Sequence, residues 1–160
     1  MIRTATPADA PVIARIYAPF ISDTIVTFEE VAVSVEEMEQ RIRQVMASYP
    51  WLVYEEEGAV IGYAYGTQWR QRAAYRRTVE TAIYLAPEAL GRGVGRMLYQ
   101  ALLDDLRERG FHVAMGVIAL PNAESVVLHE KLGFAKAAHF TEVGYKFGRW
   151  VDVGYWQRTL

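Results

Sequence analysis

The chain has 160 residues and a mass of 18.1 kDa, which favours one domain over residues 1–160. Hydrophobic residues make up 52% of it, so the chain is apolar enough for a folded core and too apolar for disorder. The formal net charge of −2 gives no overall attraction to nucleic acid or to an anionic membrane. The absence of cysteine excludes disulfides, thiolate metal sites and catalysis through a cysteine, and with three histidines no metal site is expected.

Neither a signal peptide nor a membrane span is expected from the sequence. The first ten residues lack the apolar run of a signal peptide. No segment reaches the ~20 consecutive apolar residues that a membrane span needs. The sequence therefore predicts a cytoplasmic protein with no membrane partner.

The first half of the chain begins with a short strand at 2–5. Thr6-Pro7 then predicts a helix start, because threonine caps helices and proline suits the first helical position. Apolar residues follow at helical spacing. A second helix begins at Ser34, where Glu37 completes a capping box.

The pattern then changes to strands. The runs 51–55 and 60–65 surround Glu57-Gly58, which predicts a hairpin. Residues 78–85 predict a third strand of this group, which ends before a proline that cannot donate to a ladder.

The second half predicts two helices and three strands. The glycine-rich segment 91–95 leads into an amphipathic helix, and residues 112–118 form the next strand. A short helix spans 122–132, and residues 134–158 predict two strands joined around 147–149. The order β-α-α-β-β-β-α-β-α-β-β predicts the α+β class with mixed α/β character: a mixed, mostly antiparallel, twisted sheet flanked by helices.

The segment 84–96 is the most informative, because a strand runs through a glycine loop into a helix. Alternate glycines let backbone N–H groups converge on one point, and the helix N-terminus adds free N–H groups and partial positive charge. Arg92 and Arg96 add full positive charge. Together these features predict a cradle for a pyrophosphate.

Several identities compete for this loop. A Walker-type loop ends in Gly-Lys-Ser or Gly-Lys-Thr, and neither is present. A dinucleotide-binding fingerprint requires glycine where Arg96 stands. A coenzyme A loop and a glycine-rich turn without a ligand both stay open on this segment alone.

Further segments carry a family resemblance along nearly the whole chain. Residues 90–95 fit the coenzyme A loop of the GNAT acetyltransferases, Gln/Arg-x-x-Gly-x-Gly/Ala, with Leu90 in the first position. His129 stands where that superfamily usually has tyrosine before Gly-Phe. The chain resembles the phosphinothricin acetyltransferase branch through segments that occur in the same order: Tyr49-Pro50-Trp51-Leu52-Val53, Ala74-Tyr75-Arg76-Arg77-Thr78-Val79-Glu80, Asn122, His129-Glu130-Lys131-Leu132-Gly133-Phe134, and Lys146-Phe147-Gly148-Arg149-Trp150 with Asp152.

The resemblance implies the GNAT fold and direct transfer of acetyl from acetyl-CoA to the α-amino group of a small amino acid. Phosphinothricin, methionine sulfoximine and methionine sulfone are the typical acceptors, which implies a role in herbicide or antibiotic resistance. It implies a homodimer and no nucleic-acid partner. Two alternatives stay open. One is a GNAT enzyme for another amine, such as a protein N-terminus, a polyamine or an aminoglycoside; the other is a non-catalytic acyl-CoA sensor.

The resemblance also assigns catalytic residues. Glu80 matches the general base that removes a proton from the amine, directly or through water. His129 would protonate the leaving thiolate or orient the substrate, because histidine donates protons near neutral pH. The alternatives without a catalytic role are that Glu80 is a surface or salt-bridged glutamate and that His129 is a partly buried structural histidine.

The remaining expected contacts fall into two groups. For the cofactor, the pantetheine arm would bond the backbone of Ile83, Tyr84 and Leu85 like an added strand, and one of these N–H groups would polarise the thioester. The other cofactor contacts are Gly91, Arg92, Gly93, Val94, Gly95, Arg96, Asn122 and Ser125. Substrate contacts would come from the arginine cluster that suits a carboxylate, from the loop between the first two helices, and from the late hairpin: Arg72, Tyr75, Arg76, Phe28, Glu29 and Lys146.

Overall fold

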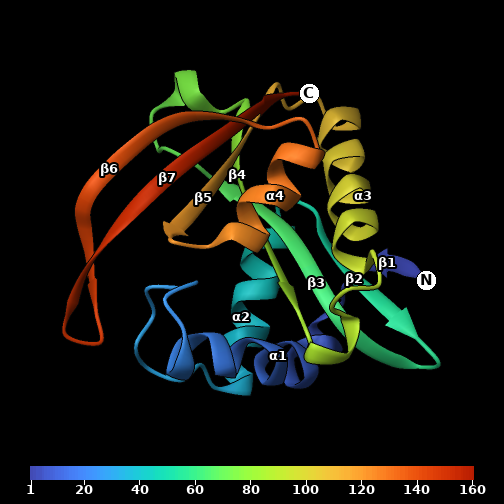
Figure 1. Cartoon of the computed structure of the whole chain (residues 1–160). Helices are drawn as coiled ribbons and strands as arrows, with labels where there is room; N and C mark the ends of the chain where they lie inside the picture. Colours follow the sequence, from blue (N-terminus) through green and yellow to red (C-terminus); the bar gives the residue numbers. More distant parts are fainter.

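The computed structural model describes residues 1–160 and contains seven strands and four α-helices (Figure 1). In chain order these are β1 (Ile2–Thr4), α1 (Ala10–Asp23), α2 (Val35–Met46), β2 (Trp51–Glu56), β3 (Ala59–Gln68), β4 (Thr78–Leu85), α3 (Val94–Glu108), β5 (Val113–Leu120), α4 (Ala123–Lys131), β6 (Ala135–Lys146) and β7 (Arg149–Thr159). Short 3-10 turns, η1 (Pro7–Asp9), η2 (Ala73–Tyr75) and η3 (Pro87–Ala89), lie between them. The predicted order of elements is confirmed.

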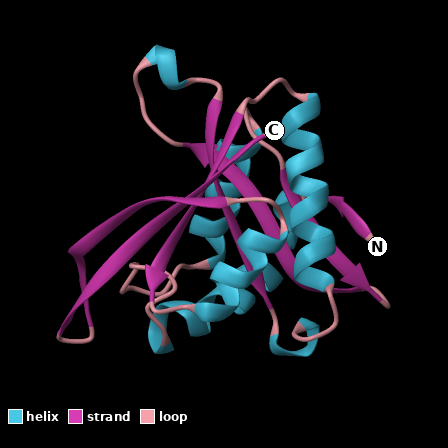
Figure 2. Ribbon diagram, turned by 45° about the horizontal axis from the view of Figure 1, so that its top comes forward, coloured by secondary structure: helices cyan, strands magenta, loops and turns pink.

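All strands join one sheet in the order β1-β2-β3-β4-β5-β7-β6. Only β4 and β5 run parallel, and every other neighbouring pair is antiparallel. The α3 crossover makes the parallel pair possible, because parallel neighbours need a long connection. Figure 2 shows helices on both sides of this sheet, as the predicted fold class requires.

The parallel pair diverges partway along its length. Pairing between β4 and β5 covers Thr78–Thr81 against Val113–Gly116. On its other side, β4 stays paired with β3 as far as Leu85. The backbone of residues 82–85 therefore has a partner strand on one side only, and the divergence opens next to α3 and α4.

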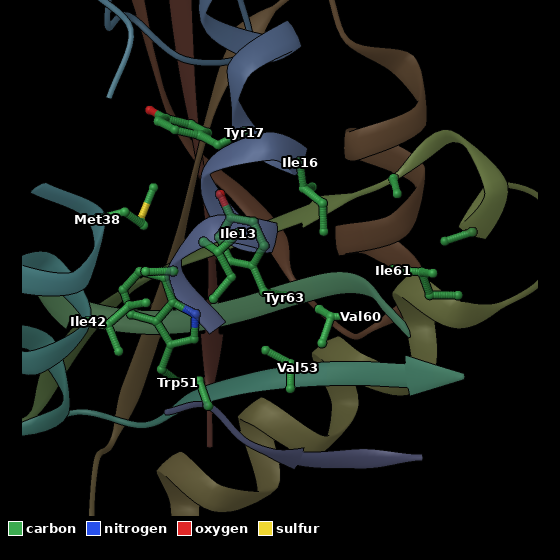
Figure 3. Packing of buried hydrophobic residues seen from close by; sticks show 14 of the residues in the cluster. Ile13, Ile16, Tyr17, Met38, Ile42, Trp51, Val53, Val60, Ile61 and Tyr63 are labelled. Atoms are coloured by element: carbon green, nitrogen blue, oxygen red, sulfur yellow. The ribbon is translucent and has the colours of Figure 1, made fainter. Parts of the chain in front are cut away.

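The sheet buries its two faces under different helices. On β2, Trp51 and Val53 lie in the cluster formed with α1 and α2, whereas Leu52 lies in the cluster under α3. This alternation follows from the period of two along a strand. Figure 3 shows Ile13 and Ile42 meeting the β2 and β3 side chains. Both isoleucines are fully buried, which stabilises the fold by about 1.5–3 kcal/mol each relative to exposure.

Two helix starts differ in detail from the sequence prediction. The first helix begins with the turn η1, and Asp9 accepts two hydrogen bonds at 2.9 Å from the Arg3 guanidinium instead of serving only the helix. Ser34 caps α2, with its Oγ accepting from the Glu37 N–H at 3.1 Å. The Glu37 carboxylate pairs with Arg41 instead of closing the capping box.

Strands β6 and β7 form a long hairpin that extends beyond the helices (Figure 1). Its turn lies at Phe147-Gly148, inside the region where the sequence places it, and both residues have positive φ. The hairpin exposes Tyr145, Phe147 and Trp150, each more than half accessible. Nothing inside this chain covers these aromatic side chains.

None of the helices combines the length and the apolar character needed to cross a membrane. The cytoplasmic location stays a prediction.

Candidate active site

Two cavities adjoin along β4. The inner cavity, about 340 Å³, is lined by Tyr17, Val26, Thr27, Phe28, Tyr65, Thr67, Glu80, Thr81, Ala82, Tyr84, Val117, Ala119 and Val153. The outer cavity, about 640 Å³, is lined by residues of α1, β4, the glycine loop and α4. Val26 and Tyr84 line both cavities, so a molecule in one cavity can reach a molecule in the other at this point.

Glu80 is the only acidic residue that lines the inner cavity. It lies in the middle of the sheet, opposite Thr67 on β3 and Met115 on β5. Its carboxylate makes no hydrogen bond, and burial raises its pKa, while the positive charge of Arg70 opposes part of this shift. A carboxylate without a donor and with a raised pKa is suited to accept a proton.

The glycine loop forms one end of the outer cavity. Gly91 and Gly93 adopt positive φ, and α3 begins directly afterwards at Val94. This conformation leaves the first N–H groups of α3 without helical partners. Arg96 lines the cavity, whereas Arg92 pairs with Glu56 at 2.7 Å on the exposed side.

Loop residues expected to bind the cofactor thus divide into two kinds. Gly91, Gly93, Gly95 and Arg96 line the cavity, as does the exposed Leu90. Val94 is 1% exposed and packs into the core beneath the loop. Its contribution to a bound pyrophosphate is restricted to its backbone.

The side walls of the outer cavity come from β4 and α4. Ile83, Tyr84 and Leu85 line it beside the divergence, where β4 has no neighbour on the β5 side. Asn122 and Ser125 line it from the start of α4. The Asn122 side chain also accepts a hydrogen bond from the Ser125 N–H at 3.2 Å, so it caps that helix.

His129 lines neither cavity and is 5% exposed. Its Nδ1 lies 2.7 Å from the Ser125 carbonyl oxygen, which only accepts, so Nδ1 carries the proton and Nε2 accepts from the Tyr99 hydroxyl at 2.9 Å. Burial lowers its pKa, which keeps the ring neutral. The structure therefore does not place it as a proton donor at the cavity, because both nitrogens are already bonded.

The His129 ring instead covers the divergence from the α4 side. A Cβ added to Gly116 would lie 2.4 Å from the His129 ring, so the ring rests on the bare backbone of β5. Tyr99 continues the contact to Thr81 Oγ1 at 2.5 Å, on β4. These side chains connect α3 and α4 to both diverging strands.

The loop between α1 and α2 contributes Phe28 to the inner cavity but not Glu29. Glu29 accepts two hydrogen bonds from Arg41 and one from the Tyr17 hydroxyl, and Arg41 lowers its pKa. Glu29 thus holds the loop against α1 and α2. The Glu29 carboxylate, which was expected to contact the substrate, is therefore occupied by Arg41 and Tyr17 and lies outside the cavity lining.

The predicted arginine cluster does not reach either cavity within this chain. Arg72, Tyr75 and Arg76 lie around η2 and are exposed. Tyr75 packs edge-on against Trp69, and the Arg76 guanidinium donates to the Ala73 carbonyl at 3.0 Å. The loop connects β3 and β4, and none of these three side chains is among the lining residues of the two cavities.

Lys146 is also not in a cavity. It is 1% exposed, and its ammonium group donates to backbone carbonyls of the α1–α2 loop.

Other cavity residues were not identified from the sequence. Tyr65 and Thr67 on β3, and Tyr17 on α1, form much of the inner wall. The alternation along β3 would have placed Tyr65 and Thr67 on the face of Glu80 once the β3–β4 register was known. No group of three or more acidic or histidine side chains is arranged to hold a metal ion.

These features define a class of protein. A divergence in a mixed sheet, a glycine loop that opens a helix, and a half-buried carboxylate that lines the adjoining cavity are suited to acyl transfer from a nucleotide-linked thioester. Residues 2–154 match the acetyltransferase (GNAT) domain family, and the chain belongs to this family. It is an N-acetyltransferase that uses acetyl-CoA, so the expected family, fold class, enzyme class and co-substrate are confirmed.

The chain is similar to phosphinothricin N-acetyltransferase of Streptomyces viridochromogenes, with 40% identity over 98% of this chain and 86% of the relative. It is 38% identical to the L-methionine sulfoximine/L-methionine sulfone acetyltransferase of Salmonella typhimurium, over 99% of this chain and 94% of the relative.

Two solved structures share the fold closely. A phosphinothricin acetyltransferase of Sinorhizobium meliloti in complex with acetyl-CoA superposes with a TM-score of 0.96 at 39% identity, covering 100% of this chain and 88% of that one. A ribosomal-protein-alanine N-acetyltransferase of Brucella melitensis gives a TM-score of 0.97 at 37% identity, covering 100% and 99%.

Proposed function

We propose that this enzyme acetylates the α-amino group of a small amino acid or analogue of the phosphinothricin and methionine sulfoximine type. The acceptor binds in the inner cavity and acetyl-CoA in the outer one. The observation that supports this most is the Glu80 carboxylate, which has no hydrogen-bond donor and lines a cavity of about 340 Å³ next to the outer one. The relatives that carry these substrate names span nearly the whole chain.

In the proposed reaction, Glu80 removes a proton from the substrate ammonium group, directly or through a water molecule. The neutral amine then attacks the acetyl carbonyl carbon, and the carbon–sulfur bond breaks. The ammonium group loses two protons in total: one passes through Glu80 to solvent, and the other ends on the coenzyme A thiol. Since the chain has no cysteine, no acyl-cysteine intermediate precedes this step.

We assign the cofactor contacts to the outer cavity. The backbone of residues 83–85 bonds the pantetheine arm along the open side of β4, and one N–H polarises the thioester carbonyl. The N–H groups at the start of α3, together with Arg96, hold the pyrophosphate. Asn122 and Ser125 bound the arm from the opposite wall.

The lining of the inner cavity disfavours an acceptor with several positive charges. Nine of its thirteen lining residues are hydrophobic, and Glu80 is its only charged side chain. A polyamine or aminoglycoside carries several cations, which would leave charges without partners in such a site. A peptide N-terminus is the second candidate, because the Brucella melitensis neighbour is a ribosomal-protein-alanine N-acetyltransferase.

The test is incubation with acetyl-CoA and a panel of amines while free thiol is measured. Any thiol detected comes from coenzyme A, since the protein has none. We expect release with phosphinothricin and methionine sulfoximine. Release only with a peptide or polyamine would refute the acceptor class, and coenzyme A binding without any release would favour a sensor.

The Glu80→Gln variant tests the base. Loss of a general base costs typically 10²–10⁴-fold in turnover, so we expect kcat to fall in this range near neutral pH. The deficit should shrink at high pH, where the free amine loses its proton unaided. Acetyl-CoA binding, measured by calorimetry, should be unchanged. Wild-type turnover in this variant would remove Glu80 from the mechanism.

We also propose that the enzyme is a homodimer that buries the exposed aromatic side chains of the β6–β7 hairpin. Tyr145 and Trp150 pack against each other with tilted rings whose centroids lie 4.7 Å apart, and both remain open to solvent in one chain. Exposed apolar groups of this kind are typical of interfaces. Light scattering should report twice the mass of 18.1 kDa, and Trp150→Lys should shift it toward the monomer. A monomeric wild type would refute the proposal.

A further inference from the structure

The inner face of the β6–β7 hairpin carries two unusual buried positions. Gly144 and Lys146 stand two residues apart on β6, so their side chains face the same way. Both are buried, whereas their neighbours Val143 and Tyr145 are exposed on the opposite face. The buried face is directed at the α1–α2 loop, which forms a wall of the inner cavity.

The Phe28 ring packs directly against the backbone of Gly144. A Cβ added at this glycine would lie 2.3 Å from Phe28 Cζ, closer than any real contact allows. The aromatic ring therefore rests on the bare backbone of β6 while it lines the inner cavity. The side chain at position 144 thus decides where this ring lies.

Lys146 fixes the backbone of the same loop. Its ammonium group donates to the carbonyls of Thr24 and Thr27 at 2.7 Å each, and reaches the Phe20 carbonyl at 3.5 Å. No carboxylate forms a salt bridge with it, so the backbone carbonyls replace the water that a buried ammonium loses. These bonds hold the loop from the end of α1 to the residue before Phe28.

A third contact also holds the α1–α2 loop against the sheet. Ile25 forms a small buried cluster with Ala119 on β5 and Val151 on β7. Residues 24–28 of the loop thus contact β5 and β7 through Ile25, and contact Lys146 and Gly144 on β6. Its conformation depends on the hairpin rather than on the loop sequence alone.

We propose that Gly144 and Lys146 are positioning residues that set the loop wall of the acceptor cavity, and thereby the size of the amine that the enzyme accepts. The inference rests on the proposed role of the inner cavity as the acceptor site. Neither residue touches the substrate, and both act through Phe28 and its loop.

The central experiment is Gly144→Ala, assayed with a small and a bulky amino acid acceptor. The new methyl group displaces Phe28, and overpacking of this kind should raise the KM for the bulky amine about tenfold. The KM for the small amine should rise less, and that for acetyl-CoA should stay within about twofold because Phe28 does not line the outer cavity. Thr141→Ala, at an exposed position of the same strand, is the matched control.

Two further variants make the test independent of folding defects. Phe28→Leu combined with Gly144→Ala gives the added methyl room, so the preference between the two amines should return toward that of Phe28→Leu alone. Lys146→Met keeps the length of the side chain but removes the ammonium group, and it should raise the amine KM with a smaller effect on acetyl-CoA. If Gly144→Ala does not fold, the amine selectivity of the double variant and of Lys146→Met tests the positioning role.

Equal changes in KM for the two amines and for acetyl-CoA, or unchanged amine selectivity, would overturn the inference. Failure of the underlying proposal has a different outcome. Wild-type activity in Glu80→Gln would remove Glu80 from the mechanism, and with it the observation that assigns the acceptor to the inner cavity. Normal selectivity in the hairpin variants together with an impaired Glu80→Gln would refute the positioning role alone.

Discussion

Replacing Tyr99 with phenylalanine would remove the hydroxyl that joins the two diverging strands to α4. This hydroxyl lies 2.5 Å from Thr81 Oγ1 and 2.9 Å from His129 Nε2, and the tyrosine is fully buried. The substitution leaves the buried Nε2 acceptor without a donor, which costs about 1–3 kcal/mol. For a chain of 160 residues, each kcal/mol lowers Tm by roughly 2–4 °C, so a loss of about 2–12 °C is expected.

Urea unfolding at neutral pH, followed by circular dichroism, measures this loss directly. Tyr49→Phe is the matched control, because Tyr49 stacks on Phe111 and its hydroxyl makes no hydrogen bond. Removing an unbonded hydroxyl from this half-buried side chain should change the free energy of unfolding by no more than about 0.5 kcal/mol. If Tyr99→Phe unfolds at the same urea concentration as Tyr49→Phe, the hydrogen-bond chain does not hold the strands and helix together.

Three other predictions concern charge. Burial lowers the pKa of His129 in the folded state. The stability that the neutral imidazole provides is therefore present above the unfolded-state pKa and is lost as pH falls through the folded-state pKa. In urea unfolding at a series of pH values, the free energy of unfolding of His129→Gln should depend less on acid than that of wild type. Since Arg70 lowers the raised pKa of Glu80, Arg70→Gln should move the acid limb of kcat/KM to higher pH, and an unmoved limb would argue against Glu80 as the base. Arg96→Ala should raise the KM for acetyl-CoA about tenfold, because the proposed phosphate contact is lost. Arg92→Ala breaks only the exposed ion pair with Glu56 and should change this KM less than about threefold. Equal effects of the two substitutions would contradict the placement of the two arginines.

The order of strands and helices could be predicted from the sequence because each depends on local periodicity and turn residues. The hairpin turns at 57–58 and 147–148 are examples, since both adopt the positive φ that short turns between strands need. The helix start at Thr6-Pro7 is also confirmed, although its first turn is the 3-10 turn η1, in which the Asp9 carboxylate also pairs with Arg3 on the neighbouring strand. The single domain over 1–160 stays a prediction, which the continuous sheet supports.

The residues of the candidate site divide in the same way. Glu80 and the glycine loop lie in strand and helix positions that the sequence pattern locates, so their place in the cavities follows from the fold. Arg72 and Arg76 lie on a loop whose direction depends on where β3 ends. Lys146 is the hardest case, because a fully buried lysine runs against the usual distribution and depends on carbonyls more than a hundred residues earlier in the chain.

The divergence between β4 and β5 makes this sheet incomplete at its centre. Unpaired edges normally lie at the margins of a sheet, where short strands or charges protect them. Here the open edge is residues 82–85, and in the proposed site acetyl-CoA lies along it. Acetyl-CoA is therefore expected to be a folding ligand as well as a reactant, slowing amide hydrogen exchange in β4 and raising Tm with concentration by mass action. A cell that depletes acetyl-CoA would then hold less of the folded enzyme as well as supply it with less substrate.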